Sequence, residues 1–289
     1  MTLLPAGTFE VDVGTAEFGN GTTTVHRQIA AGSLGTTAQL STRQPATDTD
    51  VVRHDTGAFG STGTVVAGKA VLRAAQQLAE RVLEFAATQL GVAAAECSLV
   101  EEAVVAQGKR VLLKELHQAA SAHGLALVGE GHFEGTPRSV AFNAQWFRVA
   151  VDPGTGEIRI LRSVHAADAG KVMNPMQCRG QVEGGVAQAL GAALFENVRV
   201  DASGRATTAA FRQYRLPAFA DVPRTEVVFA DTDDSVGPLG AKSMSESPFN
   251  PVALALTNAL RDATGVRFTS LPLTRDRVWQ ALASRAGEE

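Results

Sequence analysis

The sequence contains only two cysteines, Cys97 and Cys178, among its 289 residues. Two thiols are too few for a disulfide framework, a zinc knuckle or an iron–sulfur cluster. No apolar run reaches the ~18 residues that a membrane-spanning helix needs, and the first residues lack the basic and apolar regions of a secretory signal. These absences predict a cytoplasmic chain with no membrane partner, and any redox centre in it must be held by groups other than thiolates.

An excess of charge is also missing, since the formal net charge is −4 and the pI is near 5.9. Nucleic-acid-binding domains gather positive charge to neutralise phosphates, so we expect no nucleic-acid partner. The six histidines show none of the H-x-x-x-H or H-E-x-x-H spacings of zinc sites. In contrast, 45% of the residues are hydrophobic, which is enough for a sizeable core and argues against disorder.

The periodicity of apolar residues predicts alternating strands and helices. The expected strands cover residues 9–13, two short stretches within 97–110, 141–151, 158–164 and 225–230. The expected helices cover residues 25–34, 68–90, 113–123, 181–195, 248–264 and 275–283. We therefore predict an α+β fold of two α/β subdomains, which we place at residues 1–130 and 131–289.

Four glycine-rich segments lie where we expect a strand to give way to a helix or a loop. They are residues 19–22, 57–63, 180–185 and 237–243. Glycine lets backbone N–H groups approach a ligand closely, and helix N-termini favour anions. None of the segments has the spacing of a P-loop or of a G-x-G-x-x-G motif. The pattern alone predicts a protein that binds an anion or a cofactor, and for any single segment a plain turn stays an open alternative.

The residues in these segments carry a family resemblance. The strings VGTAEFGNGTTT, DTDVVRHDTGAFGSTGTVVAGKAV, GQVEGGVAQALG and GPLGAKSMSES follow one another along the chain. In this order they resemble the molybdenum-binding subunit of the xanthine dehydrogenase and aldehyde oxidase family. The resemblance covers nearly the whole chain but only the C-terminal half of a usual molybdenum subunit. It implies mixed sheets with flanking helices, and a metal held by the dithiolene of molybdopterin with no protein thiolate.

The resemblance implies cofactor contacts residue by residue. Asn20 stands where the family has a pterin-binding glutamine, and it keeps the amide but shortens its reach by one methylene. Gly60 falls where a small residue lies against the molybdenum, and Gln181 matches a second pterin-binding glutamine. The expected cofactor-binding residues are Gly19, Asn20, Gly21, Thr22, Phe59, Gly60, Ser61, Thr62, Gly63, Gln181, Lys242, Ser243, Met244 and Ser245.

Glu246 matches the catalytic glutamate of the family, which the resemblance implies to be a general base. Such a base must be ionised at the working pH and within hydrogen-bond reach of the proton that it takes. With Ser247 as N-cap and Pro248 as the first helical residue, Glu246 would lie just outside a helix N-terminus, where the dipole favours a carboxylate by about 0.3–1 kcal/mol. Ser243 and Ser245 stand where the family usually has glycines, which narrows the pocket and indicates a subfamily or an altered substrate.

The implied reaction is the hydroxylation of an N-heterocycle or an aldehyde, with water as the oxygen source. The implied cofactor is molybdopterin, with the cytosine dinucleotide form as a variant. Iron–sulfur clusters and FAD are expected on partner subunits of a hetero-oligomer. A further expected partner is the N-terminal half of the molybdenum subunit, which would make this chain a split subunit or a truncated product.

Two alternative functions stay open at this point. The first is a non-catalytic remnant that acts as a scaffold, which the missing half, Asn20 and the serines at 243 and 245 favour. The second is a protein that binds a phosphorylated ligand and has no relation to molybdenum.

Overall fold

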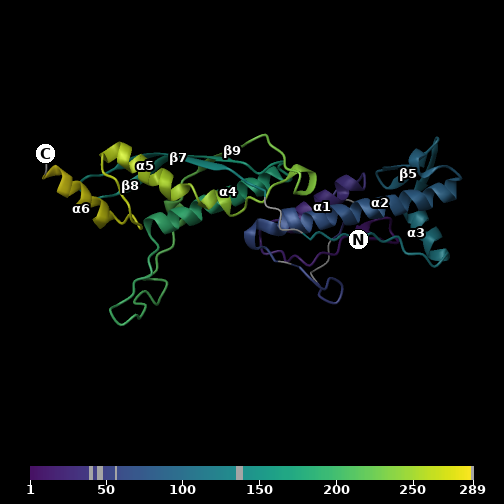
Figure 1. The fold of residues 1–289 in the computed structure, drawn as a ribbon, viewed down its shortest axis with the longest axis horizontal. Coiled ribbons are helices and arrows are strands. Elements are labelled where there is room, and N and C mark those ends of the chain that lie inside the picture. The colour runs from purple at the N-terminus through teal and green to yellow at the C-terminus, as the bar shows by residue number, and fades with distance from the viewer. Residues whose placement is uncertain (39–41, 44–47, 56, 135–138, 288–289) are drawn as a thin grey trace. The chain divides into compact units, whose positions relative to one another are not determined.

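The computed structural model describes residues 1–38, 42–43, 48–55, 57–134 and 139–287. The chain forms two compact units, each built from several stretches of sequence (Figure 1). The first unit contains Met1–Val140, Gly170–Asn174 and Thr232–Ser243, and the second contains Ala141–Ala169, Pro175–Asp231 and Met244–Glu289. The division into domains 1–130 and 131–289, which assumed continuous stretches, stays a prediction.

The first unit combines helices with two small sheets. Its helices in the described residues are α1 (Thr22–Ser33), α2 (Gly68–Leu90) and α3 (Leu113–Ala122). One sheet joins β1 (Thr2–Leu3), β2 (Phe9–Glu10) and β3 (Thr42–Arg43), and the other is an antiparallel meander of β4 (Ser98–Val100), β5 (Ala103–Ala106) and β6 (Lys109–Leu112). Short helical turns occur at η1 (Phe59–Ser61), η2 (Gly63–Ala67), η3 (Ala94–Glu96) and η5 (Pro238–Gly240).

Helix α2 follows directly from its sequence pattern. Ala74, Leu78, Val82 and Ala86 recur every four residues and are buried, so one face of the helix enters the core. Gly91 ends the helix in the left-handed conformation at φ 69°. The predicted helix over residues 68–90 is therefore confirmed, and α1 packs along it (Figure 1).

The second unit is a three-stranded sheet covered by helices. Strands β7 (Asn143–Val151) and β8 (Ile158–Ala167) are antiparallel, and β9 (Thr225–Phe229) pairs in parallel with β8. The helical elements are α4 (Pro175–Leu194), η4 (Phe219–Asp221), η6 (Ser247–Phe249), α5 (Val252–Thr264) and α6 (Arg275–Ala286). Helix α5 packs on β7 over a core that includes Phe147, Leu190 and Leu256 (Figure 1). The predicted fold class is confirmed, with open sheets of mixed helix-and-strand architecture.

Two predicted helix starts are wrong. Helix α4 begins at Pro175, well before Gln181, because proline is tolerated in the first turn and Gly180 is accommodated within the helix. Helix α5 begins at Val252, and the residues from Ser247 to Phe249 form a separate short turn. Pro248 and Pro251 contribute to this, because neither can donate a backbone hydrogen bond.

A segment that the sequence patterns did not single out lies against α2. A Cβ at Gly131 would collide with the carbonyl oxygen of Ala70 and lie 2.6 Å from the amide nitrogen of Ala74. A Cβ at Gly129 would likewise collide with the carbonyl oxygen of Ala74 and lie 2.6 Å from the amide nitrogen of Leu78. Both glycines therefore let this segment approach the helix backbone.

Gly131→Ala should lower the free energy of unfolding by about 1–3 kcal/mol, because the added methyl forces helix and segment apart. The matched control is Gly32→Ala in α1, where a Cβ would meet no described atom within 4 Å. This control should be neutral or stabilising by up to ~1 kcal/mol, as is usual for a helical glycine. Thermal unfolding of the two variants measures the difference, and equal midpoints would contradict the close approach.

Candidate functional site

The glycine-rich loop 57–63 lies against helix α1 in the first unit. A Cβ on Gly63 would be 2.9 Å from Cγ2 of Thr22, so only glycine allows this approach without a shift. The Nε2 atom of His26 lies 2.9 Å from the carbonyl oxygen of Gly63. The structure therefore brings together the predicted segments 19–22 and 57–63.

His26 is fully buried at this contact. A carbonyl oxygen only accepts hydrogen bonds, so Nε2 carries the proton and donates it to Gly63. Burial lowers the pKa of His26, which favours the neutral ring. Its Nδ1 atom has no hydrogen-bond partner among the residues that the structure describes. Sequence reasoning missed this residue, because a histidine between Val25 and Ile29 on the apolar stripe of α1 gives no spacing signal.

The third glycine-rich segment of the first unit meets the start of α2. A Cβ on Gly68 would be 3.1 Å from Cγ of Pro238, and the Nζ atom of Lys69 donates to the carbonyl oxygen of Gly237 at 3.3 Å. On its other side, the segment accepts a hydrogen bond at Gly240 from the backbone of Lys171. The loop 57–63 leads through η2 into α2. Three of the four glycine-rich segments, 19–22, 57–63 and 237–243, therefore meet in this unit.

Two of these segments hold strained backbone. The described non-glycine residues with positive φ are Ser61, Glu101, Gln107 and Leu239. Glu101 and Gln107 lie in the turns of the β4–β5–β6 meander, where such backbone is common. Ser61 (φ 58°) and Leu239 (φ 53°) lie in the candidate segments instead. Strain of roughly 1–3 kcal/mol per residue is typical of functional sites, where the surrounding structure maintains it.

The segments 19–22 and 57–63 each contain a glycine whose backbone is open on the side where a Cβ would lie. An added Cβ at Gly60 (φ 62°) or Gly19 (φ 98°) would meet nothing within 4 Å among the described residues. A flat heteroatom-rich cofactor fits such backbone, because it can lie directly on it. The Thr62 hydroxyl donates to the carbonyl oxygen of Gly57 at 2.6 Å, so its lone pairs are what it can offer to a ligand.

The N–H groups before α1 are bound by the chain itself. The Glu17 carboxylate accepts from the backbone N–H groups of Gly19, Gly21 and Thr23, at 2.8, 3.1 and 2.9 Å. Partial burial opposes ionisation of this carboxyl, but hydrogen bonds from Thr23, Gly21 and Gly19 outweigh it and hold the pKa of Glu17 below its usual value. The anion that we expected at this helix N-terminus is therefore the protein's own carboxylate.

The side-chain amide of Asn20 contacts Thr22 at the start of α1. Its Oδ1 atom accepts from the backbone N–H of Thr22 at 3.4 Å and from the Thr22 hydroxyl at 3.1 Å. The carbonyl of the amide is thus turned toward α1. A ligand contact from Asn20 would use the Nδ2 donors.

In the second unit, α4 approaches the segment that carries Glu246. A Cβ on Gly185 would be 3.0 Å from Cβ of Pro248, so this glycine allows η6 to pack closely on the helix. Gln181 is partly buried in the same helix, within its second turn rather than at an N-terminus as we expected. Gly185 therefore serves helix packing, and the glycines at 180–185 lie inside the helix rather than at its N-terminus.

Glu246 is the N-cap residue of η6 and is exposed. The expected N-cap, Ser247, instead donates its hydroxyl to the carbonyl oxygen of Met244 at 2.8 Å. Met244 is buried, and Ser245 is partly exposed. The predicted segment spans both units, because Lys242 and Ser243 belong to the first.

Lys242 and Ser243 both contact the segment that precedes β7. The Nζ atom of Lys242 donates to the carbonyl oxygen of Val140 at 3.2 Å, and the backbone N–H of Ser243 donates to Oγ of Ser139 at 3.2 Å. Their roles as cofactor contacts stay a prediction, as do those of Gly19, Gly21, Thr22, Phe59 and Gly63.

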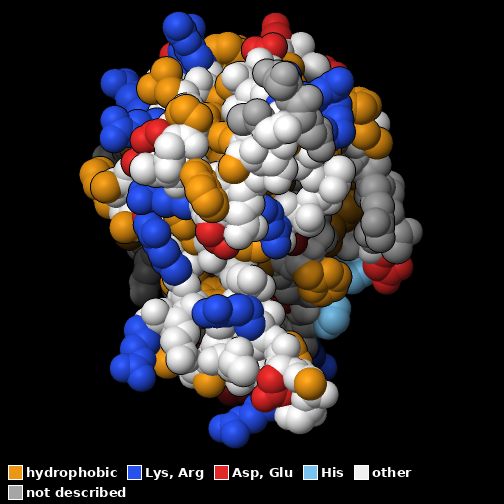
Figure 2. Space-filling model, turned by 90° about the vertical axis from the view of Figure 1, so that its left-hand side faces the viewer, with side chains coloured by type: hydrophobic (Ala, Val, Ile, Leu, Met, Phe, Trp, Pro, Cys, Tyr) orange, Lys and Arg blue, Asp and Glu red, His pale blue; other side chains and the backbone are white. Residues whose placement is uncertain are grey.

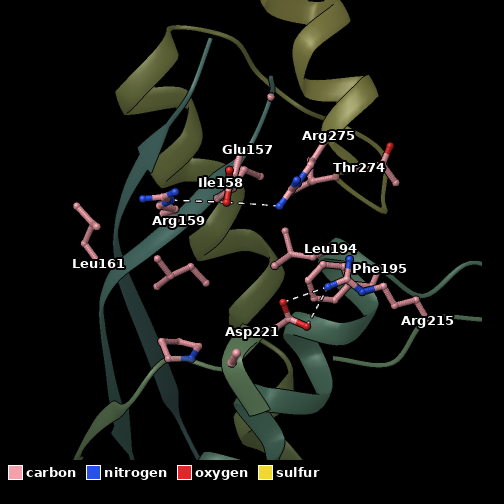
Figure 3. A pocket seen from close by; sticks show the side chains of 15 residues that line it. Glu157, Ile158, Arg159, Leu161, Leu194, Phe195, Arg215, Asp221, Thr274 and Arg275 are labelled. Atoms are coloured by element: carbon pink, nitrogen blue, oxygen red, sulfur yellow. Dashed lines mark hydrogen bonds and ion pairs between the residues drawn. The ribbon is translucent and has the colours of Figure 1, made fainter. Parts of the chain in front are cut away.

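A pocket of about 700 Å³ in the second unit lies apart from every predicted site residue (Figure 3). Arg159 and Arg275 both face the Glu157 carboxylate, at 3.6 and 3.4 Å. Arg215 pairs with Asp221 and lies over the ring of Phe195 (Figure 3). Three arginines thus share two carboxylates, which leaves the pocket with one excess positive charge.

Figure 2 shows basic side chains scattered among hydrophobic ones over one face of the molecule.

Among the described residues, no group of three or more His, Cys, Asp or Glu side chains is arranged to hold a metal ion. No helix in this part of the chain has the length and apolar character needed to cross a membrane.

Comparisons with known proteins place the chain in a family. A family model described as "Molybdopterin cofactor-binding domain" matches residues 1–223. The chain is 33% identical over 282 residues to the xanthine dehydrogenase molybdenum-binding subunit of Escherichia coli O157:H7, and the match covers 95% of this chain. This chain spans 38% of that relative.

Solved structures of similar proteins have the same fold. A structure of CO dehydrogenase from Oligotropha carboxidovorans superposes with a TM-score of 0.87 at 26% identity, over 99% of this chain and 37% of that one. Quinoline 2-oxidoreductase from Pseudomonas putida 86 gives a TM-score of 0.84 at 25% identity, over 98% of this chain and 37% of that one.

Glu17→Gln should destabilise the protein at neutral pH by on the order of 1 kcal/mol, because an amide accepts weaker hydrogen bonds than a carboxylate. The folded pKa of Glu17 lies below its ordinary value of 4.5. Its stabilising contribution is therefore complete above about pH 4.5 and is lost as the pH falls through the folded pKa.

Thermal unfolding between pH 7 and pH 3 measures this effect, and the midpoints of wild type and Glu17→Gln should converge below pH 4.5. Glu84→Gln on the exposed face of α2 is the control and should match wild type throughout. A constant gap between wild type and Glu17→Gln down to pH 3 would contradict the assignment.

Proposed function

Because this chain belongs to the family of molybdopterin cofactor-binding domains, we propose that it holds molybdopterin in a molybdenum hydroxylase and supplies the catalytic base. The observation that carries the proposal is the meeting of three glycine-rich segments at the start of α2, with uncovered and strained backbone at Gly60 and Ser61. Backbone of this kind is costly to form, which supports a role in ligand binding.

The cofactor contacts in the first unit follow from what each group can offer. Gly60 is the proposed residue beside the metal, because its backbone is open to a ligand and a Cβ there would meet no described atom within 4 Å. Asn20 would donate through Nδ2, and Thr62 would accept through its hydroxyl oxygen. The other proposed contacts in this unit are Gly19, Gly21, Thr22, Phe59, Ser61, Gly63, Lys242 and Ser243.

In the second unit, Gln181 is a proposed pterin contact and Glu246 the proposed base. When bound, the cofactor supplies the two-electron redox centre for hydroxylating an N-heterocycle or an aldehyde, with water as the oxygen source. Glu246 takes a proton during this reaction. Its backbone is fixed because its carbonyl accepts from the N–H of Phe249 at 3.2 Å, and Ser247 donates back to Met244. Met244 and Ser245 would contact the cofactor beside it.

We propose three partners for the chain: the N-terminal half of the molybdenum subunit, an iron–sulfur subunit and an FAD subunit. The coverage supports this, since the chain spans 38% of a relative that is itself described as a subunit. The cytosine dinucleotide form of the cofactor and a cytoplasmic location also belong to the proposal.

The test is metal and pterin analysis of the chain purified with its natural partners. Molybdenum and pterin should each be present at close to one per chain. A scaffold that binds partners without turnover would co-purify with them but contain neither. Partnered protein without molybdenum and pterin would therefore overturn the proposed function in favour of the scaffold.

Glu246→Gln should lower kcat by ~10²-fold or more while molybdenum content is retained, because the amide is isosteric but cannot take the proton. The matched control is Glu226→Gln, which removes an exposed carboxylate paired with Arg162 in the same unit. This control should keep normal turnover. Normal turnover in Glu246→Gln would remove Glu246 from the mechanism.

Gln181→Ala should lower the molybdopterin occupancy of the assembled protein, through one or two lost hydrogen bonds of ~1 kcal/mol each. Occupancy is measured as molybdenum per chain. Gln188→Ala, on the exposed face of the same helix, is the control and should keep full occupancy. Equal occupancy of the two variants would argue against the contact.

A further inference from the structure

One end of the sheet in the second unit has a polar buried face. Gln145 of β7 lies opposite His165 of β8, and Ser163 of β8 lies opposite Thr225 of β9. His165 and Ser163 are fully buried, and Thr225 is 2% exposed. These residues, together with Asn143 of β7, form what we call the polar row.

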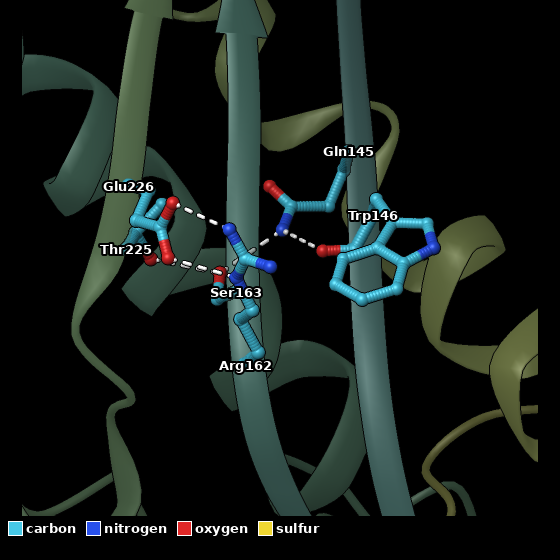
Figure 4. A network of polar contacts seen from close by, with 6 residues as sticks. All are labelled: Gln145, Trp146, Arg162, Ser163, Thr225 and Glu226. Atoms are coloured by element: carbon cyan, nitrogen blue, oxygen red, sulfur yellow. Dashed lines mark hydrogen bonds and ion pairs between the residues drawn. The ribbon is translucent and has the colours of Figure 1, made fainter.

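Close polar contacts join the members of the polar row. The Thr225 and Ser163 hydroxyls are 2.9 Å apart, and the Gln145 amide nitrogen lies 3.0 Å from the Ser163 hydroxyl (Figure 4). The His165 ring follows, with Nδ1 at 2.8 Å from the amide of Gln145 and Nε2 at 3.0 Å from Oδ1 of Asn143. Trp146, Arg162 and Glu226 lie on the other, exposed face of the same strands (Figure 4).

The polar row ends beside Glu246. The Nδ2 atom of Asn143 donates to Oγ of Ser247 at 2.9 Å, and Oγ of Ser247 donates to the carbonyl oxygen of Met244 at 2.8 Å. The row thus reaches the backbone on both sides of Glu246. The same turn packs on α4 through Pro248 and Gly185, which limits its other movements.

The contact with Asn143 fixes one nitrogen of the histidine ring. Asn143 uses its Nδ2 on Ser247, so its oxygen faces the ring, and Nε2 of His165 donates to it. The Gln145 amide nitrogen donates to the Ser163 hydroxyl and to the carbonyl oxygen of Trp146, so the Gln145 oxygen lies 2.8 Å from Nδ1. Burial lowers the pKa of His165 to about 4, which disfavours a second proton on the ring.

We propose that His165 is a positioning residue for Glu246. Its Nε2–H orients Asn143, which holds Ser247 and so sets the backbone that carries the carboxylate. This inference rests on the proposed role of Glu246 as the base. A base displaced by about 1 Å loses much of its rate, so a residue one hydrogen-bonded path away affects turnover without touching substrate.

The experiment uses the full chain in its natural assembly and compares His165→Leu with His165→Gln. His165→Leu removes both ring hydrogen bonds, whereas His165→Gln keeps a donor for Oδ1 of Asn143. Tyr214→Phe is the control, since it removes a hydrogen bond to Glu196 in the same unit but off this path. The readouts are hydrogen–deuterium exchange of the peptide spanning residues 244–249, kcat, KM and molybdenum content.

His165→Leu should raise exchange over 244–249 by about 10-fold or more and lower kcat about 10-fold, with KM and molybdenum content unchanged. His165→Gln should recover most of both losses, and Tyr214→Phe should match wild type. In a Glu246→Gln background His165→Leu should lower kcat no further, because no base is left to position. An equal kcat loss in both backgrounds, or unchanged exchange, would overturn the inference.

Ser247→Ala covers the case in which His165→Leu fails to assemble. It interrupts the same path at its other end, so it should raise exchange over 244–249 to a similar extent, and unchanged exchange would also overturn the inference. Turnover retained by Glu246→Gln would instead refute the proposed function. In that case the exchange data still decide whether His165 orders the segment.

Discussion

The candidate site in the first unit depends on the close approach of the Gly63 backbone to helix α1. Gly63 fits beside Thr22 because it has no side chain, and its carbonyl accepts a hydrogen bond from the buried His26 ring. These two contacts hold the end of the loop 57–63, and α2 starts a few residues later. Gly68 and Lys69 then meet the segment at Gly237, so the contacts at Gly63 and at the start of α2 together bring the three glycine-rich segments into one place.

The second unit depends on polar contacts in its interior. Most of the sheet's buried face is apolar, as Phe147 shows, but the end near Ser247 is not. A buried polar group without a partner costs roughly 1–3 kcal/mol, so a row of five such residues persists only when each member is satisfied. That requirement gives the row one arrangement, which makes it a rigid support for the turn at Glu246. An apolar row would pack as well but would not orient Ser247.

Much of the fold could be predicted from the sequence where the pattern is long and regular. The stripe of α2 and the hairpin of β7 and β8 are examples, because many residues repeat the same signal. The site was harder, because its supports are single residues. His26 occupies an apolar position, and Glu17 binds N–H groups that glycine spacing alone assigns to a ligand. The helix was expected to start at Gln181, but α4 begins at Pro175 and contains Gly180, although glycine has a low helix propensity.

A buried histidine supports the proposed contact residues in each of the two units. His26 donates to the backbone of Gly63, and His165 acts on the 244–249 turn through Asn143. Burial lowers the pKa of each ring, which favours the uncharged form and makes each ring a weaker base than an exposed histidine. What a neutral imidazole offers is one directional N–H on a rigid ring with few rotamers. That property suits a support, because it fixes a backbone group without adding charge beside the site. Neither histidine therefore competes with the proposed base, Glu246, for the proton.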